Sequence, residues 1–433
     1  MRLARRIKQR IDQSDIGTRI ANGAFWSFLG SAVSKAVVLV STILCARILG
    51  KSGFGEFGMV RTTISLFAVV GFAGMGITAT KHISEFRNRA KERIGSIYLL
   101  TNGFAILMGI LLTIAIIISA PFLARNTLNA EYLSFDIQIG AILLFVTILN
   151  GVQSGILSGF EAFRSIAQNT LWGGLAEAAF MLLGAYLYGV TGAILGYGFG
   201  FFVLYLFNRN SIRNLIKSNC IDTSYKSFNK SDLSLLYKFS LPAMLSSLCV
   251  APTYWLVKSF LVRMNGFEEL AEYEAASQWQ AIILFIPSAI SQVVLPILSS
   301  TVSDGKSRFW KILKINLLLN GGVALIIATC VSVASPFIIK MYGETFSDYN
   351  TLIFLALSTI FSSLANVVGL SISSRSKMWI GFMCNFLWAI TTVALSYIFI
   401  SCNMGASGVA GAILIAYALH TVIQLIYLKS ITK

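Results

Sequence analysis

Residues 378–428 read MWIGFMCNFLWAITTVALSYIFISCNMGASGVAGAILIAYALHTVIQLIYL, with no Asp, Glu, Lys or Arg among them. A helix that spans a bilayer needs about 20 apolar residues, so these 51 residues are too many for one helix. The segment Asn403-Met404-Gly405-Ala406-Ser407-Gly408 interrupts the stretch with residues that are typical of turns. The stretch therefore predicts two membrane-spanning helices that are joined by a short turn.

The apolar character extends along the whole chain of 433 residues. Hydrophobic residues make up 56% of the sequence and charged residues only 12%, with a mean hydropathy of +0.75. An ordinary globular domain has about 25% charged residues. The formal net charge of +16 would suggest nucleic-acid binding in a soluble protein, but here the cations stand between apolar runs. The composition excludes a soluble enzyme and predicts a polytopic membrane protein.

The intervals between charges predict an all-α fold of about twelve transmembrane helices. These helices are expected near 21–46, 56–80, 96–120, 134–158, 168–188, 191–208, 239–262, 275–301, 314–339, 350–373, 379–401 and 407–428. Pro242, Pro287 and Pro296 fall inside these spans, and each is expected to kink its helix by removing a backbone hydrogen bond.

The distribution of basic residues predicts the orientation of the chain. Of the 34 Lys and Arg residues, 26 fall on the side that holds the N-terminus and five on the opposite side. Basic residues are enriched in cytoplasmic loops of membrane proteins. Both termini are therefore expected to be cytoplasmic.

An internal repeat relates the two halves of the chain. A shift of about 216 residues aligns Arg47-x-x-Gly50 with Arg263-x-x-Gly266, Pro121-Phe122 with Pro336-Phe337, and Gly189-x-Thr191-Gly192 with Gly405-x-Ser407-Gly408. Because six helices per half is an even number, the repeat predicts two lobes of the same orientation, related by a pseudo-two-fold axis along the membrane normal. The expected lobes are 1–208, which starts with a basic cytoplasmic segment at 1–20, and 239–433, joined by a cytoplasmic linker at 209–238.

Four stretches of the sequence carry a resemblance to a known family. They are Ala46-Arg47-Ile48-Leu49-Gly50 with Gly53-Phe54-Gly55-Glu56-Phe57; Gly155-Ile156-Leu157-Ser158-Gly159-Phe160-Glu161-Ala162-Phe163; Phe239-Ser240-Leu241-Pro242; and Ile286-Pro287-Ser288-Ala289 with Leu295-Pro296-Ile297-Leu298-Ser299. The chain resembles the polysaccharide (O-antigen) flippase branch of the multidrug, oligosaccharidyl-lipid and polysaccharide exporter superfamily, over nearly its entire length.

The resemblance implies a function in transport. It implies a flippase of the bacterial inner membrane that moves undecaprenyl-diphosphate-linked oligosaccharides to the outer leaflet by alternating access, for O-antigen, capsule or exopolysaccharide synthesis. A polysaccharide polymerase and assembly proteins are the partners that it suggests, without a cofactor or a nucleic acid. The alternatives are an H⁺- or Na⁺-coupled multidrug or metabolite antiporter of the same superfamily, and a lipid-scrambling or assembly scaffold without coupled transport.

Four charged residues fall inside the predicted spans: Lys35, Arg61, Lys258 and Glu177. A charge at the bilayer centre costs about 2.5–3.5 kcal/mol on insertion scales, so such residues usually face a wet cavity. Arg61 and Lys258 lie close enough to helix ends to reach the membrane interface instead, and Lys35 has an ion pair with Glu177 as its alternative. Glu177 is the only deep carboxylate.

The sign of these charges favours an anionic substrate. Three cations against one acid suit a diphosphate, because ammonium and guanidinium groups form charge-assisted hydrogen bonds with phosphate oxygens. Arg47 and Arg263, at equivalent outer helix ends, are further candidates for diphosphate binding, with interfacial anchoring as the alternative. Glu177 and, more weakly, His420 are the candidates for proton coupling.

The sequence offers no pattern typical of catalysis or of a metal centre. Its six cysteines are scattered singly, its two histidines are far apart, and no P-loop sequence is present. We therefore expect a transporter and not an enzyme.

Overall fold

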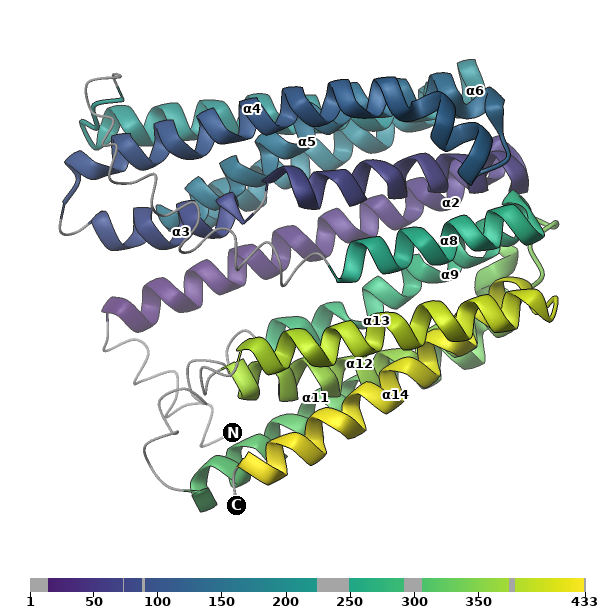
Figure 1. Ribbon diagram of the computed structural model, residues 1–433. Coiled ribbons are helices and arrows are strands. Elements are labelled where there is room, and N and C mark those ends of the chain that lie inside the picture. The colour runs from purple at the N-terminus through teal and green to yellow at the C-terminus, as the bar shows by residue number, and fades with distance from the viewer. Residues whose placement is uncertain are drawn as a thin grey trace. The chain divides into compact units, whose positions relative to one another are not determined.

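The computed structural model describes residues 15–72, 74–87, 90–223, 249–291, 306–373 and 378–431. All regular secondary structure in these residues is helical (Figure 1). The helices are α2 (Asp15–Phe72), α3 (Met75–Phe86), α4 (Glu92–Phe122), α5 (Ser134–Gly159), α6 (Phe163–Ser218), α8 (Val250–Asn265), α9 (Phe267–Ile283), α11 (Lys306–Lys340), α12 (Tyr349–Ser373), α13 (Met378–Ser401) and α14 (Gly405–Ile431). A π-helical turn at Leu123–Thr127 and a 3₁₀ turn at Glu131–Leu133 connect α4 to α5.

Eight helical segments among the described residues are long and apolar enough to cross a membrane. Their outward faces carry large apolar side chains, and Ile118, Leu318 and Val333 are 75%, 76% and 79% exposed. A helix that is apolar on every side needs lipid or protein around it. The chain is therefore a multi-pass membrane protein, as its composition predicts.

Several predicted helix boundaries are confirmed at glycine residues with positive φ. The turn after residue 401 is confirmed, with Asn403 at φ 58° and Gly405 at φ 55°. Gly50 (φ 71°, ψ 175°) breaks α2, and Gly189 (φ 60°, ψ −136°) breaks α6 together with Tyr188. Glycine and, less often, asparagine adopt positive φ at low cost, so each break occurs where such a residue stands.

Other boundaries differ from the prediction. The expected single helix over 56–80 is wrong, because α2 ends at Phe72 and α3 begins at Met75, after Gly74 with φ 73°. α9 begins at Phe267, eight residues before the predicted start, and a turn at Leu284 separates it from the helical residues 285–291. Pro287 explains this turn, because its missing N–H cannot bond to the carbonyl of Ile283.

The remaining proline predictions and part of the linker lie outside the described residues. Pro242 and Pro296 fall in the undescribed segments 224–248 and 292–305. The first part of the predicted 209–238 linker continues α6 as a helix to Ser218. The division into lobes at 208 and 239 stays a prediction.

The chain forms two compact units. Unit 1 takes its described residues from Met1–Thr42, Ile64–Pro121 and Ser134–Ser247, and unit 2 from Ile43–Thr63, Phe122–Leu133 and Leu248–Lys433. Within unit 2, α12 packs against α11 and α14, and a core cluster links the ends of α11, α12 and α14 through Phe309, Val368 and Leu428. Within unit 1, α5 packs against α3 and α6, which lie beside it in Figure 1.

A glycine stripe in α6 lets the two parts of this helix fold against each other. After the break at Gly189, the chain returns so that a Cβ on Gly192 would lie 2.1 Å from the carbonyl oxygen of Gly184. A Cβ on Gly196 would lie 2.0 Å from the oxygen of Phe180. Small residues at this spacing allow helix backbones to approach closely in membranes.

Replacing Gly196 with alanine should therefore destabilise unit 1, by about 1–3 kcal/mol for an overpacked contact. The matched control is Gly103→Ala, because a Cβ on helical Gly103 meets nothing within 4 Å. We expect a lower midpoint of thermal unfolding in detergent for Gly196→Ala only. Equal midpoints for the two variants would contradict this packing.

Candidate functional site

A cluster of charged side chains lies inside unit 2 and includes two of the predicted site residues. The carboxylate of Glu274 accepts hydrogen bonds from Arg61 Nη2 at 2.8 Å and from Lys258 Nζ at 2.6 Å. The hydroxyl of Thr62 lies 2.9 Å from Lys258 Nζ and 3.4 Å from Glu274 Oε1. The side chain of Glu274 is 1% exposed, that of Arg61 19% and that of Lys258 12%. We call Arg61, Thr62, Lys258 and Glu274 the charged cluster.

Three helices position the charged cluster. Arg61 and Thr62 lie in α2, about three turns after the break at Gly50, while Lys258 lies in α8 and Glu274 two turns into α9. Gly58 makes room for the carboxylate, because a Cβ at this position would lie 2.7 Å from Glu274 Cγ. The helix after Gly50 can therefore approach α9 closely enough to form the ion pairs.

The charged cluster contains more positive than negative charge. One carboxylate neutralises one of its two cations, so the cluster carries a net charge of +1. Buried ion pairs pay a large desolvation cost, and removal of one partner leaves an uncompensated charge. The fold already places the guanidinium of Arg61 and the ammonium of Lys258 together. An anion could replace the carboxylate as the hydrogen-bond partner of both groups.

This geometry gives Arg61 and Lys258 a common partner, because both bind Glu274. It also corrects one expectation from the sequence. Glu177 is not the only buried carboxylate, since Glu272 and Glu274 are each 1% exposed. The predicted span start at 275 placed both acids in a loop, whereas they lie in α9.

A second ion pair connects the part of α2 next to the break at Gly50 with the remainder of unit 2. Lys51 Nζ lies 2.8 Å from Glu272 Oε1, which also accepts the backbone N–H of Ser347 at 2.9 Å. Next to the break, Arg47 Nε donates to the carbonyl oxygen of Met341 at 2.6 Å. We call Lys51, Glu272 and the Arg47–Met341 contact the α2 latch. Its role would be to fix residues 43–63 against α9 and the end of α11.

The other predicted residues are distributed over both units. Lys35, on α2 in unit 1, is exposed, and Glu177, on α6 in the same unit, is half-buried. α2 and α6 are neighbours there, since a Cβ on Gly174 would lie 3.1 Å from Ser34 Oγ. The structure thus brings Arg61 and Lys258 together and places Lys35 in a different compact unit.

The remaining candidates lie in unit 2 and differ in their surroundings. Arg263, the repeat equivalent of Arg47, is exposed at the end of α8. His420 is buried, and its Nδ1 lies 3.1 Å from the carbonyl oxygen of Cys384. Among the described residues, no group of three or more His, Cys, Asp or Glu side chains could hold a metal ion.

Known proteins resemble this chain over most of its length. It is 23% identical over 418 residues to the EPS I polysaccharide export inner membrane protein EpsE of Ralstonia solanacearum, covering 93% of this chain and 92% of that protein. It is 25% identical to a putative O-antigen transporter of Shigella flexneri, covering 95% and 97% of the two chains. The lipid III flippase of Escherichia coli K12 is 24% identical over 65% of this chain and 67% of its own.

Solved structures share the fold. A MATE family multidrug resistance transporter of the MOP superfamily, in an inward-facing conformation, matches with a TM-score of 0.82 and 14% identity, over 94% of this chain and 98% of its own. A multidrug resistance MATE family transporter in an outward-facing conformation matches with a TM-score of 0.72 and 15% identity, over 98% of this chain and 97% of its own. At this identity the likeness concerns the fold alone.

A family model described as "Polysaccharide biosynthesis protein" matches residues 20–302, which is more than half of the chain. This match and the two relatives that align over more than nine-tenths of the chain agree with the resemblance carried by the four sequence stretches. The chain therefore belongs to the polysaccharide biosynthesis protein family.

Proposed function

We propose that this protein is a flippase that translocates undecaprenyl-diphosphate-linked oligosaccharides across the bacterial inner membrane, for the synthesis of a surface polysaccharide. The observation that carries the proposal is the full-length similarity to proteins named for polysaccharide export and O-antigen transport. Both of these proteins align with this chain over more than nine-tenths of its residues. The protein moves its substrate and does not transform it chemically.

The charged cluster supports an anionic substrate. Arg61 and Lys258 would release Glu274 and bind the diphosphate, and Lys35 is a further cation that we propose for its binding. Arg47 and Arg263 would bind the diphosphate near the outer ends of the helices that carry them. Guanidinium groups bind phosphate oxygens in a bidentate geometry and ammonium groups bind them as point charges, so both types of cation suit this ligand.

We further propose twelve transmembrane helices in two six-helix lobes with pseudo-two-fold symmetry. Repeat-equivalent glycines share unusual backbone angles, since Gly50 has φ 71° and ψ 175° and Gly266 has φ 93° and ψ 176°. Gly189 and Gly405, also equivalent, both have positive φ. Gly58 and Glu274, which the 216-residue shift equates, contact each other, as expected for residues near a two-fold axis. Rocking of such lobes about a central site would give alternating access.

The orientation that we propose places both termini in the cytoplasm, on the basis of the bias of Lys and Arg to one side. Glu177 and His420 are the proposed groups for coupling to a proton gradient, because Glu177 is a carboxylate inside a predicted span and a histidine titrates near neutral pH. A polysaccharide polymerase and assembly proteins would act on the exported substrate.

Deletion of the gene in its host should abolish the surface polysaccharide and cause the lipid-linked oligosaccharide to accumulate in the inner leaflet. The wild-type chain should restore export, and Lys35→Ala should not, at an equal protein level. Lys35→Arg should restore part of the export, because a charge at this position still attracts phosphate although its geometry changes. Immunoblots of surface polysaccharide and quantification of the lipid-linked precursor measure both effects.

An antiporter would behave differently in the same strains. Its efflux of cationic dyes would depend on Glu177 and be indifferent to Lys35, and deletion would leave the surface polysaccharide intact. The fold shared with MATE transporters does not favour this alternative, because the identity is only 14%. Dye efflux with intact polysaccharide would overturn the flippase proposal.

A further inference from the structure

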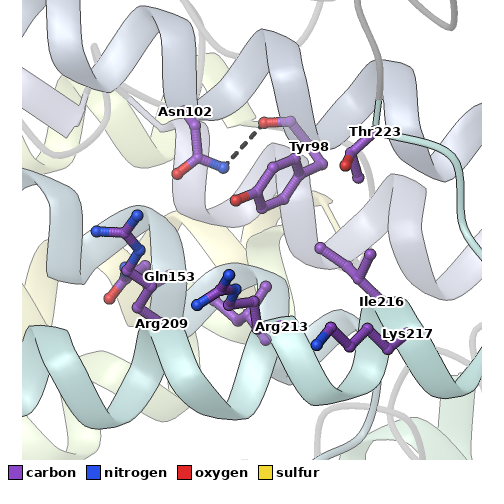
Figure 2. Close-up of a pocket in the computed structure, with 9 residues that line it drawn as sticks. Tyr98, Asn102, Gln153, Arg209, Arg213, Ile216, Lys217 and Thr223 are labelled. Carbon is purple, nitrogen blue, oxygen red and sulfur yellow. Dashed lines mark hydrogen bonds between the residues drawn. The ribbon is translucent and has the colours of Figure 1, made fainter.

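A cavity of about 320 Å³ lies within unit 1, separate from the charged cluster of unit 2. Figure 2 shows three cations of α6 in a row, facing the helix that carries Tyr98 and Asn102. The polar side chains that line the cavity are Tyr98 and Asn102 of α4, Gln153 of α5, Arg209, Arg213 and Lys217 of α6, and Thr223. Its volume lies in the range of roughly 300–1,000 Å³ that small-molecule sites occupy.

The cations of this cavity lack an acidic partner in the described part of the chain. Arg209, Arg213 and Lys217 follow one another at intervals of four residues, so they share one face of α6. Like charges at this spacing repel each other. None of the ion pairs among the described residues includes any of the three. The arrangement therefore favours binding of an anion.

The buried side chain of Gln153 places a second, independent requirement on the ligand of this cavity. Its side chain is 4% exposed and lines the cavity, yet its Oε1 has no hydrogen-bond partner among the described residues. One turn earlier in α5, Asn150 donates to the carbonyl oxygen of Phe201, so neighbouring amides do find partners. Buried polar atoms are normally hydrogen-bonded, and a carbonyl oxygen needs a donor. A ligand for this cavity should offer a hydroxyl group as well as anionic oxygens.

The helix surface beside the cavity is apolar and exposed. Phe202, Leu206 and Phe207 precede the three cations in α6 and are 43%, 47% and 41% exposed. If the phosphate of a ligand binds Arg209, its acyl or isoprenyl chain can therefore pack along α6 toward Phe202. This continuity favours a ligand that is anchored in the membrane over a free anion.

We propose that this cavity binds the head group of a membrane-anchored phosphate ester that carries hydroxyl groups. The two arginines bind the phosphate through their N–H groups, Lys217 adds a point charge, and Gln153 accepts a hydroxyl of the head group. Two sources share this chemistry: an acidic phospholipid with a glycerol head group, and the lipid-linked sugar. Only the second source rests on the proposed function.

Binding to the purified full-length protein in detergent tests this proposal. Native mass spectrometry would measure the dissociation constants of three probes: phosphatidylglycerol, phosphatidic acid, whose phosphate bears no hydroxylated group, and undecaprenyl-diphosphate-linked N-acetylglucosamine. The double variant Arg209→Gln/Arg213→Gln should weaken the preferred lipid at least about tenfold, because it removes two charge-assisted contacts. The matched control Lys311→Gln/Lys314→Gln removes two exposed cations from α11 of unit 2 and should leave binding within about twofold.

A second variant tests the hydroxyl contact. Gln153→Leu should weaken phosphatidylglycerol or the lipid-linked sugar several-fold and leave phosphatidic acid unchanged. An equal loss for all three probes would overturn the hydroxyl assignment, and wild-type affinity in the double arginine variant would overturn the site. Selective loss of the lipid-linked sugar identifies it as the ligand, whereas selective loss of phosphatidylglycerol identifies a phospholipid. Because no transport is measured, these results stand even if the flippase proposal fails.

Discussion

Export of the surface polysaccharide should fall at least about tenfold when Lys258 is replaced with methionine, and it should stay low when Glu274→Gln is added. One charge-assisted hydrogen bond contributes about 1.5–3 kcal/mol, which corresponds to a factor of ten or more in substrate binding. Methionine keeps most of the volume of the lysine stem, so packing in α8 is preserved. The measurement is the amount of surface polysaccharide at an equal level of folded protein.

The double variant separates substrate binding from structural pairing. Glu274→Gln alone leaves Arg61 and Lys258 without their carboxylate and should destabilise unit 2 by about 3–5 kcal/mol. Adding Lys258→Met removes one of the two unpaired cations, so the level of folded protein should recover, as measured by monodispersity in detergent. If export recovers together with folding, the charged cluster is purely structural and does not bind the diphosphate.

The sequence predicted the helical breaks well because each depends on one local residue. Gly50, Gly189 and the turn at Asn403 end apolar runs, and glycine or asparagine at such points permits positive φ. The 56–80 helix was wrong for a similar local reason, since Gly74 has φ 73° and interrupts a run that is apolar throughout. Hydropathy marks apolar runs, but it does not distinguish one helix from two helices with a short break.

The charged cluster was predicted only in part because its pairing is not local. Arg61 and Lys258 were identified by the cost of a charge inside an apolar span. Glu274 lies 213 residues from Arg61 along the chain and stands among the acids of Phe267–Ile283, which resemble a polar loop. The usable signal was the repeat, because Gly266 is equivalent to the helix break at Gly50 and predicts a helix start at Phe267.

Sequence equivalence also does not ensure an equivalent environment. Arg47 and Arg263 occupy matching positions in the repeat and are both exposed, yet Arg47 donates to the Met341 carbonyl whereas the Arg263 side chain has no hydrogen bond among the described residues. Residues 43–63 and their repeat equivalents in α8 and α9 both lie in unit 2, so equivalent positions of the repeat have different neighbours within one unit. A substrate role shared by the two arginines therefore needs separate tests of each.

Replacing Lys51 with methionine should open the charged cluster to reagents from outside the cell. The α2 latch holds residues 43–63 through the Lys51–Glu272 pair at 2.8 Å. Loss of Lys51 leaves the buried carboxylate with the Ser347 N–H as its one remaining partner among the described residues. In a chain that lacks its six native cysteines, Thr62→Cys reports access to the cluster. Its labelling by a membrane-impermeant maleimide in right-side-out vesicles should become about tenfold faster, which corresponds to a shift of about 1.4 kcal/mol toward the open form.

Two controls decide whether the faster labelling reflects opening or general loosening of unit 2. Lys340→Met removes an exposed cation at the end of α11 that forms no ion pair among the described residues, and it should leave the labelling rate unchanged. Adding Glu272→Gln to Lys51→Met removes the unpaired buried charge, while the glutamine oxygen still accepts the Ser347 N–H. Folding stability should then recover, yet labelling should stay fast because the ion pair that closes the latch is still absent. A return to the slow rate would show that Lys51 stabilises unit 2 without controlling access to the cluster.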